Sequence, residues 1–347
     1  MCLYPIYIKN PRYIPNKKNG GNPPKADDKR KLYVPVGCGK CIECRRQLSN
    51  NWKIRLSEEL DSLTREHTQV HAGTREHTHA DARRDLPNLK AYYITLTFSE
   101  EKLNWYQSIC ERYTNINDVV AVAVRHFLER WRRKYTTSLR HWLITELGHE
   151  NTERIHLHGI VFTTEDKIKT LNERWGNGFI RIGQYCNQKT INYIVKYITK
   201  IDNDHQEYEP KIFCSAGIGS NYIYTINGRK EKTDGRGIKF NKYNGEETRE
   251  YYLTKKGFKL ALPMYYRNYI YTEEEKEKLW IQKLNKQEKY VDKVKYELKT
   301  DEDIKNYLNA LKTAQKNNIK NGYGQRKYKE QEYEKLLIKL RKKEDMQ

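Results

Sequence analysis

The sequence predicts an α+β fold with a central, mainly antiparallel sheet, helices packed on one face of the sheet, and a helical C-terminal extension. Between residues 91 and 201 the segments follow the order strand, helix, strand, strand, helix, strand, helix, which is typical of α+β proteins. A polar turn at 148–153 joins two of these strands as a hairpin, and strands joined in this way are antiparallel. We expect an extended arm at 1–35, a domain at 36–270 with an insertion at about 64–84, and a charged helical extension at 271–347.

The composition is that of a basic, tyrosine-rich chain. The net charge is +21, and there are 28 tyrosines. This charge indicates a polyanionic partner without distinguishing DNA, RNA and a membrane surface. Tyrosines among cations suit stacking on single-stranded bases, although AT-rich coding explains the same composition. No apolar stretch approaches the ~20 residues that cross a bilayer, and the first residues lack a secretory pattern, so we expect a cytoplasmic protein.

The elements of the domain are predicted from the spacing of apolar residues, which alternate in strands and recur every three or four residues in helices. The predicted strands are Ala91–Phe98, His141–Leu147, Arg154–Phe162 and Phe179–Ile182. The predicted helices are Ser49–Leu63, a helix capped by Asp118, Glu165–Trp175 and Thr190–Lys200. Residues 1–30 are rich in Pro and Gly, which predicts an extended or irregular segment. Residues 64–84 repeat Thr-Arg-Glu-His-Thr and are interpreted as a solvated insertion without chemistry.

Beyond residue 201 the pattern weakens. Strand-like pieces occur at Tyr222–Ile226 and Glu250–Leu253. Thr272 is a predicted N-cap, and from there the chain is charged and helical to its end, with an interruption at Asn321-Gly322. This extension is a basic clamp, an assembly arm or a solvated helix.

A cysteine cluster precedes the first helix. Cys38, Cys41 and Cys44 have the spacing C-x2-C-x2-C, which can place three thiolates around a structural Zn²⁺ or an iron–sulfur cluster. Cys2 or a histidine could supply the fourth ligand. The alternative is a set of reduced thiols in a tight turn that opens the helix. Seven cysteines, an odd number, argue against a disulfide framework.

Two histidines lie on one face of a predicted strand. His156 and His158 alternate with Ile155 and Leu157, so both imidazoles project from the same side. Glu146 closes the preceding strand, and the hairpin could bring its carboxylate near them. Two imidazoles and a carboxylate with open positions suit Mg²⁺ or Mn²⁺. Histidines that serve only packing and hydrogen bonding remain the alternative.

Two tyrosines and two lysines share one face of a predicted helix. An apolar stripe at Ile191, Ile194, Val195 and Ile198 is complete without aromatic residues. The opposite face carries Tyr193, Lys196, Tyr197 and Lys200. This face suits a scissile phosphodiester, with lysines that offset phosphate charge and favour the phenolate. A solvated face with incidental tyrosines is the alternative.

These segments resemble, in order, the three motifs of the HUH endonucleases, the rolling-circle replication initiators. The segments are Tyr93-Ile-Thr-Leu-Thr-Phe98, Ile155-His-Leu-His-Gly-Ile-Val-Phe162 and Tyr193-Ile-Val-Lys-Tyr-Ile-Thr-Lys200. More narrowly, the chain resembles the replication initiators of microviruses of the gokushovirus type, in Val36-Gly-Cys-Gly-Lys-Cys-Ile-Glu-Cys44, Gly217-Ile-Gly-Ser-Asn-Tyr222 and Leu262-Pro-Met-Tyr-Tyr266. The resemblance covers about residues 36–270; it does not extend to the insertion or the tail.

The resemblance implies an RRM/ferredoxin-like core that nicks single-stranded origin DNA with Mg²⁺ or Mn²⁺ held by His156, His158 and Glu146. One of Tyr193 and Tyr197 would form a 5′-phosphotyrosine link and release a 3′-OH, and the other would act when the product is circularised. It also implies a host helicase and DNA polymerase as partners, in the cytoplasm of a bacterial host. The rival interpretations are a transposase or relaxase with the same core, and a noncatalytic basic protein that coats or packages phage DNA.

Overall fold

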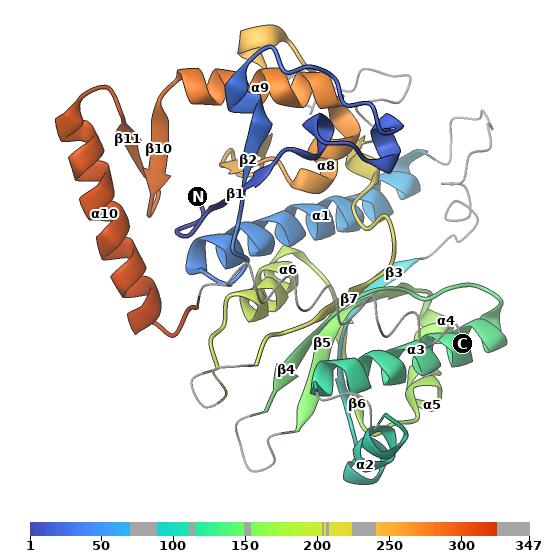
Figure 1. Ribbon diagram of the computed structural model, residues 1–347. Coiled ribbons are helices and arrows are strands. Elements are labelled where there is room, and N and C mark those ends of the chain that lie inside the picture. Colours follow the sequence, from blue (N-terminus) through green and yellow to red (C-terminus); the bar gives the residue numbers. More distant parts are fainter. Residues whose placement is uncertain are drawn as a thin grey trace. The chain divides into compact units, whose positions relative to one another are not determined.

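The computed structural model describes residues 1–69, 89–110, 115–148, 154–202, 205, 208–223 and 241–324 (Figure 1). The chain divides into two compact units, which we describe separately. Unit 1 comprises Met1–Leu48, Lys232–Leu253 and Lys259–Gln347, and unit 2 comprises Ser49–Glu231 and Thr254–Phe258. Among the described residues, no helix combines the length and apolar character needed to span a membrane.

Unit 2 is built on a five-stranded antiparallel sheet with the strand order β6-β3-β5-β4-β7. The strands are β3 (Lys90–Thr97), β4 (Arg140–Leu147), β5 (Ile155–Thr163), β6 (Ile180–Tyr185) and β7 (Ile212–Cys214). The predicted hairpin is β4–β5, and the backbone N–H of Gly148 donates to the carbonyl of Arg154 over 2.9 Å where it closes. The α+β class and the antiparallel sheet are therefore confirmed. Strand β7 is too short to show alternation, so the sequence did not predict it.

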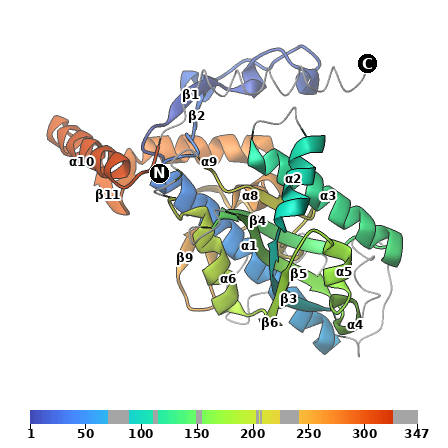
Figure 2. The same cartoon turned by 90° about the horizontal axis from the view of Figure 1, so that it is seen from below.

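Helices lie against both faces of this sheet (Figure 2). The helices are α1 (Ile42–Gln69, in unit 2 from Ser49), α2 (Glu100–Ile109), α3 (Ile116–Tyr135), α4 (Glu165–Ile168), α5 (Leu171–Trp175), α6 (Gln188–Ile194) and the 3-10 turn η5 (Val195–Ile198). One core joins α2, α3 and α5 to residues such as Ile94 and Leu157. The other joins α1 and α6 to Trp142 and Ile160. Alternate strand residues thus enter different cores, and the expected helical layer on one face has a counterpart on the other.

Several predicted boundaries need correction. The first helix is longer than Ser49–Leu63 and begins directly after the cysteine turn. The helix expected over Glu165–Trp175 is two short helices, because the chain turns at Thr170, whose hydroxyl donates to the Lys167 carbonyl over 2.9 Å. The helix expected from Asp118 begins slightly earlier, with Asn115 as its cap. Of the predicted insertion at 64–84, residues up to 69 belong to α1, and the rest lies outside the described residues.

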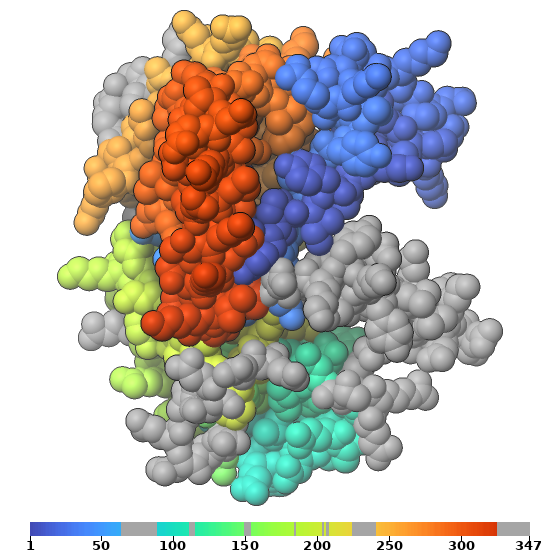
Figure 3. Space-filling model, turned by 60° about the vertical axis from the view of Figure 1, so that its left-hand side comes forward, coloured from blue at the N-terminus to red at the C-terminus, as the bar shows by residue number. Residues whose placement is uncertain are grey.

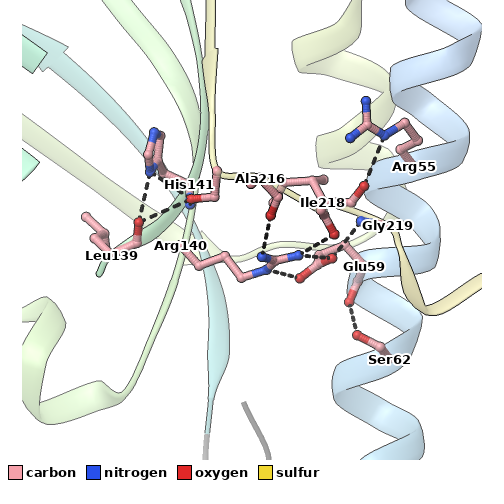
Figure 4. Close-up of polar contacts among 11 residues, drawn as sticks. Arg55, Glu59, Ser62, Leu139, Arg140, His141, Ala216, Ile218 and Gly219 are labelled. Atoms are coloured by element: carbon pink, nitrogen blue, oxygen red, sulfur yellow. Dashed lines mark hydrogen bonds and ion pairs between the residues drawn. The ribbon is translucent and has the colours of Figure 1, made fainter. Parts of the chain in front are cut away.

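A buried ion pair fixes a glycine-rich loop against α1 in unit 2 (Figure 4). The guanidinium of Arg140 donates to both oxygens of Glu59, at 2.7 Å for Nη2 to Oε2, and to the carbonyl of Gly217 at 2.8 Å. The backbone N–H of Gly219 donates to the same carboxylate over 2.7 Å. Gly219 has φ +74°, and a Cβ there would lie 2.4 Å from the carbonyl oxygen of Arg55. Only glycine allows this approach, and the charges are compensated by each other and by backbone groups.

Unit 1 begins with short regular elements in the region that was expected to be extended or irregular. These are β1 (Ile6–Lys9), η1 (Pro11–Tyr13), η2 (Lys17–Asn19), η3 (Lys29–Leu32) and β2 (Tyr33–Val36). Strands β1 and β2 pair with each other antiparallel, as a two-stranded sheet. Four residues per strand is too few for alternation to predict them.

The remainder of unit 1 combines helices with two hairpins. Its elements are η6 (Gly245–Glu247), β8 (Tyr251–Leu253), β9 (Lys259–Ala261), α8 (Met264–Ile270), α9 (Glu273–Asn285), β10 (Glu288–Val291), β11 (Val294–Glu297) and α10 (Asp301–Lys320). The predicted strand near 250–253 is confirmed as β8. The strand predicted at Tyr222–Ile226 is wrong where it is described, because 221–223 are helical; the rest lies outside the described residues.

The C-terminal extension is helical as expected but contains an unexpected hairpin. Thr272 caps α9, accepting from the Glu275 N–H over 3.2 Å, as predicted. The turn between β10 and β11 consists of Asp292 and Lys293, both with positive φ (45° and 71°). Such turns usually carry Asn-Gly or Asp-Gly, so the absence of glycine concealed the hairpin. Helix α10 ends at Asn321, as expected.

Candidate active site

Strand β5 presents His156 and His158 on the sheet face that α1 and α6 cover. Their neighbours Ile155 and Leu157 are buried in the opposite core, while both histidines are only partly buried. In the β4–β5 register Glu146 lies directly across from His156. Its Oε2 is 2.8 Å from Nε2 of His158. The structure therefore brings the two predicted imidazoles and the predicted carboxylate onto one patch of the sheet.

Each histidine has a second contact that orients its ring. Nδ1 of His156 donates to the carbonyl oxygen of Arg154 over 2.6 Å. Nδ1 of His158 lies 3.0 Å from the hydroxyl of Tyr93 and 3.1 Å from that of Thr95. Histidines that bind metals through Nε2 are commonly held in this way at Nδ1. The sequence analysis did not single out Tyr93 and Thr95; the pairing of Thr95 with His158 in the β3–β5 register explains why they belong here.

The tyrosine helix packs as its periodicity predicts. Ile191, Ile194, Val195 and Ile198 are buried, and the opposite side carries Tyr193, Lys196, Tyr197 and Lys200. The hydroxyls of Tyr193 and Tyr197 lie 2.8 Å apart. The ring of Tyr197 stacks on the imidazole of His158, with 4.7 Å between ring centroids and 5° between planes. The pair of phenols and the histidine strand therefore form a single site.

The two lysines occupy different environments. Lys196 is exposed. The ammonium of Lys200 instead forms an ion pair with Oε1 of Glu146. Burial opposes ionisation of Glu146, but hydrogen bonds and charge from His158 and Lys200 outweigh it and lower the pKa of this carboxyl. Glu146 is therefore an anion held between two cationic or hydrogen-bonding partners.

Burial, the hydrogen bond to Tyr193 and the nearby charge of Glu146 all raise the pKa of Tyr197 above its usual value. This overturns, for Tyr197 in the free protein, the expectation that the lysines favour a phenolate. The position of Lys200 gives the physical reason, because its charge is directed at Glu146. Tyr193 is the more accessible of the two rings, with 49% of its surface exposed.

Beside Glu146 lies a small pocket of about 20 Å³, large enough for a single water-sized group. Its lining includes Tyr197, Lys200, Asp202 and Tyr208. Burial raises the pKa of Tyr208, which keeps this phenol neutral. Asp202 and Tyr208 were not predicted, because the segment after residue 201 shows no periodicity that would place them.

The donor set of His156, His158 and Glu146 fits a divalent cation in chemistry. Both Nδ1 atoms are already bonded, so the Nε2 atoms are the ones available for coordination, and Glu146 is ionised. The ligand atoms are not yet gathered as in a filled site. Within the described part of the chain, one group of at least three His, Cys, Asp or Glu side chains has its ligand atoms within 4.8 Å of one another, and this group consists of cysteines.

That group is Cys2, Cys38, Cys41 and Cys44 in unit 1. The predicted C-x2-C-x2-C thiols are brought together, and of the two suggested sources of a fourth ligand it is Cys2 that joins them. The cluster could bind a metal ion such as Zn²⁺. All seven cysteines of the chain are free thiols.

Comparison with known proteins places the sheet and the tyrosine helix in a family context. Residues 91–202, about a third of the chain, match a family model of replication-associated proteins, the ORF2 family. No curated protein and no solved structure matches the chain. The matched stretch contains the hairpin β4–β5 and all of Glu146, His156, His158, Tyr193 and Tyr197. The site described above thus lies in the part of the chain that is similar to replication-associated proteins, which is consistent with a rolling-circle replication initiator.

Proposed function

We propose that this chain initiates rolling-circle replication by nicking single-stranded origin DNA with a tyrosine and later rejoining the strand. The observation that carries the proposal is the position of the tyrosine pair. The two hydroxyls are 2.8 Å apart, and Tyr197 stacks on His158 at 4.7 Å. A solvated helix face with incidental tyrosines gives no reason for this contact with a histidine and carboxylate cluster.

The residues that would hold Mg²⁺ or Mn²⁺ are His156 and His158, through Nε2, and Glu146. When bound, the cation would polarise a phosphate oxygen and so make phosphorus a better target. Its arrival has a consequence for Lys200. Coordination of Glu146 would weaken its ion pair with this ammonium, whose charge then becomes available to the phosphate. Lys196, which is exposed on the same helix face, would contact the DNA backbone.

The reaction is an exchange of phosphodiester bonds. A phenolic oxygen attacks phosphorus, the bond from phosphorus to the 3′ oxygen breaks, and the 5′ phosphate stays on the tyrosine. The phenol loses one proton and the leaving 3′ oxygen gains one, so the step is balanced. Because the bond energy is kept in the phosphotyrosine, no nucleotide triphosphate is required. In the joining step the free 3′-OH attacks this link and restores the DNA strand.

Two tyrosines allow the cycle to be repeated at one site. After one round of synthesis the second phenol cleaves the regenerated origin, and the released 3′-OH attacks the first link to circularise the product. The 2.8 Å distance between the hydroxyls lets both reach nearly the same point. In the proposed setting the substrate is the origin of a microvirus of the gokushovirus type, and a host helicase and polymerase act with the chain in the bacterial cytoplasm.

The test uses an origin oligonucleotide labelled at both ends, incubated with Mn²⁺ or with chelator and resolved on a denaturing gel. We expect a metal-dependent covalent adduct that the double variant Tyr193→Phe/Tyr197→Phe does not form. Tyr290→Phe, at an exposed tyrosine of β10, is the matched control and should form the adduct normally. Each single Phe variant should lose circularisation, and full circularisation by either would refute the alternating use of two tyrosines.

A DNA-coating protein gives a different result in the same experiment. Coating would persist in chelator and produce no adduct, while salt would weaken both coating and nicking because each phosphate contact releases counterions. Tight binding without an adduct on any phage-derived origin would therefore replace the nuclease with the coating protein. A transposase or relaxase would form the adduct but prefer other DNA ends over a replication origin.

A further inference from the structure

We propose that Cys2, Cys38, Cys41 and Cys44 bind one Zn²⁺ as a closed tetrathiolate site that holds the N-terminal residues and helix α10 together within unit 1. The sulfur positions support this directly. Sγ of Cys38 and Cys44 are 4.0 Å apart, those of Cys2 and Cys41 are 3.9 Å apart, and all four lie within 4.8 Å of one another. A Zn–S distance of about 2.3 Å in tetrahedral geometry places neighbouring sulfurs about 3.8 Å apart.

The observed separations exclude the other common arrangements of four cysteines. A disulfide joins its sulfurs at about 2.05 Å, which is far shorter than any spacing seen here. A cluster with two or more irons distributes its cysteines over different metal atoms and needs at least some sulfur pairs farther apart than the edge of a single tetrahedron. Four sulfurs gathered around one point leave room for one mononuclear ion.

The backbone around the site is arranged to support negative sulfur atoms. The N–H groups of Cys38 and Tyr4 point at Sγ of Cys2, at 3.2 and 3.3 Å, and the N–H of Cys41 points at Sγ of Cys38 at 3.3 Å. Such bonds compensate part of the charge that four thiolates add beyond that of Zn²⁺. The turn passes through Gly39 with φ +80°, a conformation that glycine adopts without strain.

The environment is that of a structural site. Cys38 and Cys41 are 1% and 0% exposed. With four sulfur ligands no coordination position remains for water or substrate, which distinguishes structural from catalytic zinc. The site therefore goes beyond the proposed DNA chemistry and does not depend on it.

The segments joined at the site are far apart in sequence. Leu3 is buried with Val291 of β10 and Ala314 of α10 in the same small core as the cysteines. The side chain of Gln315 donates to the Leu3 carbonyl over 2.8 Å, and the Ile42 N–H donates to the side chain of Asn318 over 2.9 Å. Figure 3 shows α10 and its hairpin, in red, beside the blue N-terminal residues of this unit. An apolar core this small gains much of its stability from a cross-link, which zinc would supply.

The first experiment measures metal in the full chain. Protein expressed with zinc in the medium is passed through a desalting column, and its metals are quantified by mass spectrometry. We expect about one zinc per chain, and after exchange with Co²⁺ we expect the absorption bands of tetrahedral thiolate coordination. A folded wild-type chain that carries no zinc and takes up neither Zn²⁺ nor Co²⁺ would overturn the proposal, as would iron in place of zinc.

Variants then identify the ligands. Cys2→Ser should reduce bound zinc at least tenfold, whereas Cys214→Ser, at an exposed thiol of unit 2, should leave the content unchanged. Cys2→His keeps a zinc ligand and should retain metal with altered Co²⁺ bands. Because this variant can be measured even where Cys2→Ser misfolds, the assignment stays testable. Full zinc content and unchanged Co²⁺ bands in Cys2→Ser would show that Cys2 is not a ligand.

Discussion

The four-cysteine cluster of unit 1 and the histidine–tyrosine site of unit 2 offer metal ligands in opposite states of preparation. The four sulfurs already lie within 4.8 Å of one another and are surrounded by backbone N–H groups. In the other site Glu146 is held by Lys200 and His158, so a cation must replace protein contacts in order to bind. A permanently gathered site suits a structural ion, and a site that exchanges internal contacts for metal and phosphate suits catalysis on a substrate that comes and goes.

The largest expected effect separates stability from chemistry. Cys41→Ser removes one zinc ligand, and because structural zinc sites contribute ~10 kcal/mol or more, unit 1 should lose most of its stability. We expect amide hydrogens in α10 and β1 to exchange more than about 10²-fold faster. Nicking of a short oligonucleotide should change much less. His158→Ala should give the opposite result, with His126→Ala on α3 as its matched control. Loss of nicking in Cys41→Ser with unchanged exchange would erase the distinction between the two sites.

The next effect concerns a carboxylate that resembles Glu146 in type but serves the fold. Glu59 is buried with Arg140, and Glu59→Gln would leave a buried guanidinium without a charged partner. We expect the free energy of unfolding of unit 2 to fall by about 3 kcal/mol, measured by denaturant titration. Asp61→Asn on the same helix breaks an ion pair with the exposed Lys255 and should cost under about 1 kcal/mol. Equal losses in the two variants would contradict the structural role of the buried pair.

Sequence periodicity predicted the faces of the active site well and its contacts poorly. The period of two placed His156 and His158 together, and the helical period placed Tyr193 opposite its apolar stripe. The ion pair between Lys200 and Glu146 joins residues 54 positions apart, and neither period reports such a distance. Local patterns determine which side of an element a residue occupies, whereas strand register and tertiary packing determine what it meets there.

The same limit applies to unit 1. The spacing of Cys38, Cys41 and Cys44 predicted a metal cluster, but Cys2 lies 36 residues before Cys38 and carries no spacing signal of its own. The hairpin β10–β11 was hidden because its turn residues Asp292 and Lys293 include no glycine. In both places the missing information is a contact between segments that are distant in sequence or an atypical residue in a strained turn.

A smaller effect tests whether the catalytic site depends on its supporting hydroxyls. Tyr93 and Thr95 both contact Nδ1 of His158, and partners of this kind typically contribute about 10- to 100-fold to metal affinity or activity. The double variant Tyr93→Phe/Thr95→Val should therefore raise the Mn²⁺ concentration needed for half-maximal nicking by about 10-fold or more. Its zinc content should not change. An unaltered Mn²⁺ requirement would mean that His158 does not bind the catalytic metal through Nε2.

The smallest effect is a dependence on pH that only the open site should show. In Tyr193→Phe the remaining nucleophile is Tyr197, whose pKa is raised above the usual ~10, chiefly by burial. The phenolate attacks, and below its pKa the phenolate fraction grows tenfold with each pH unit. Single-turnover cleavage with saturating Mg²⁺ should therefore accelerate by about tenfold per unit between roughly pH 7 and 9. Bound zinc should stay constant over this range, because thiolates already coordinated to the metal have no proton to lose. A flat cleavage profile would show that Tyr197 gives up its proton to another group at the moment of attack, and Glu146, which lies beside Lys200, would be the first residue to replace with Gln.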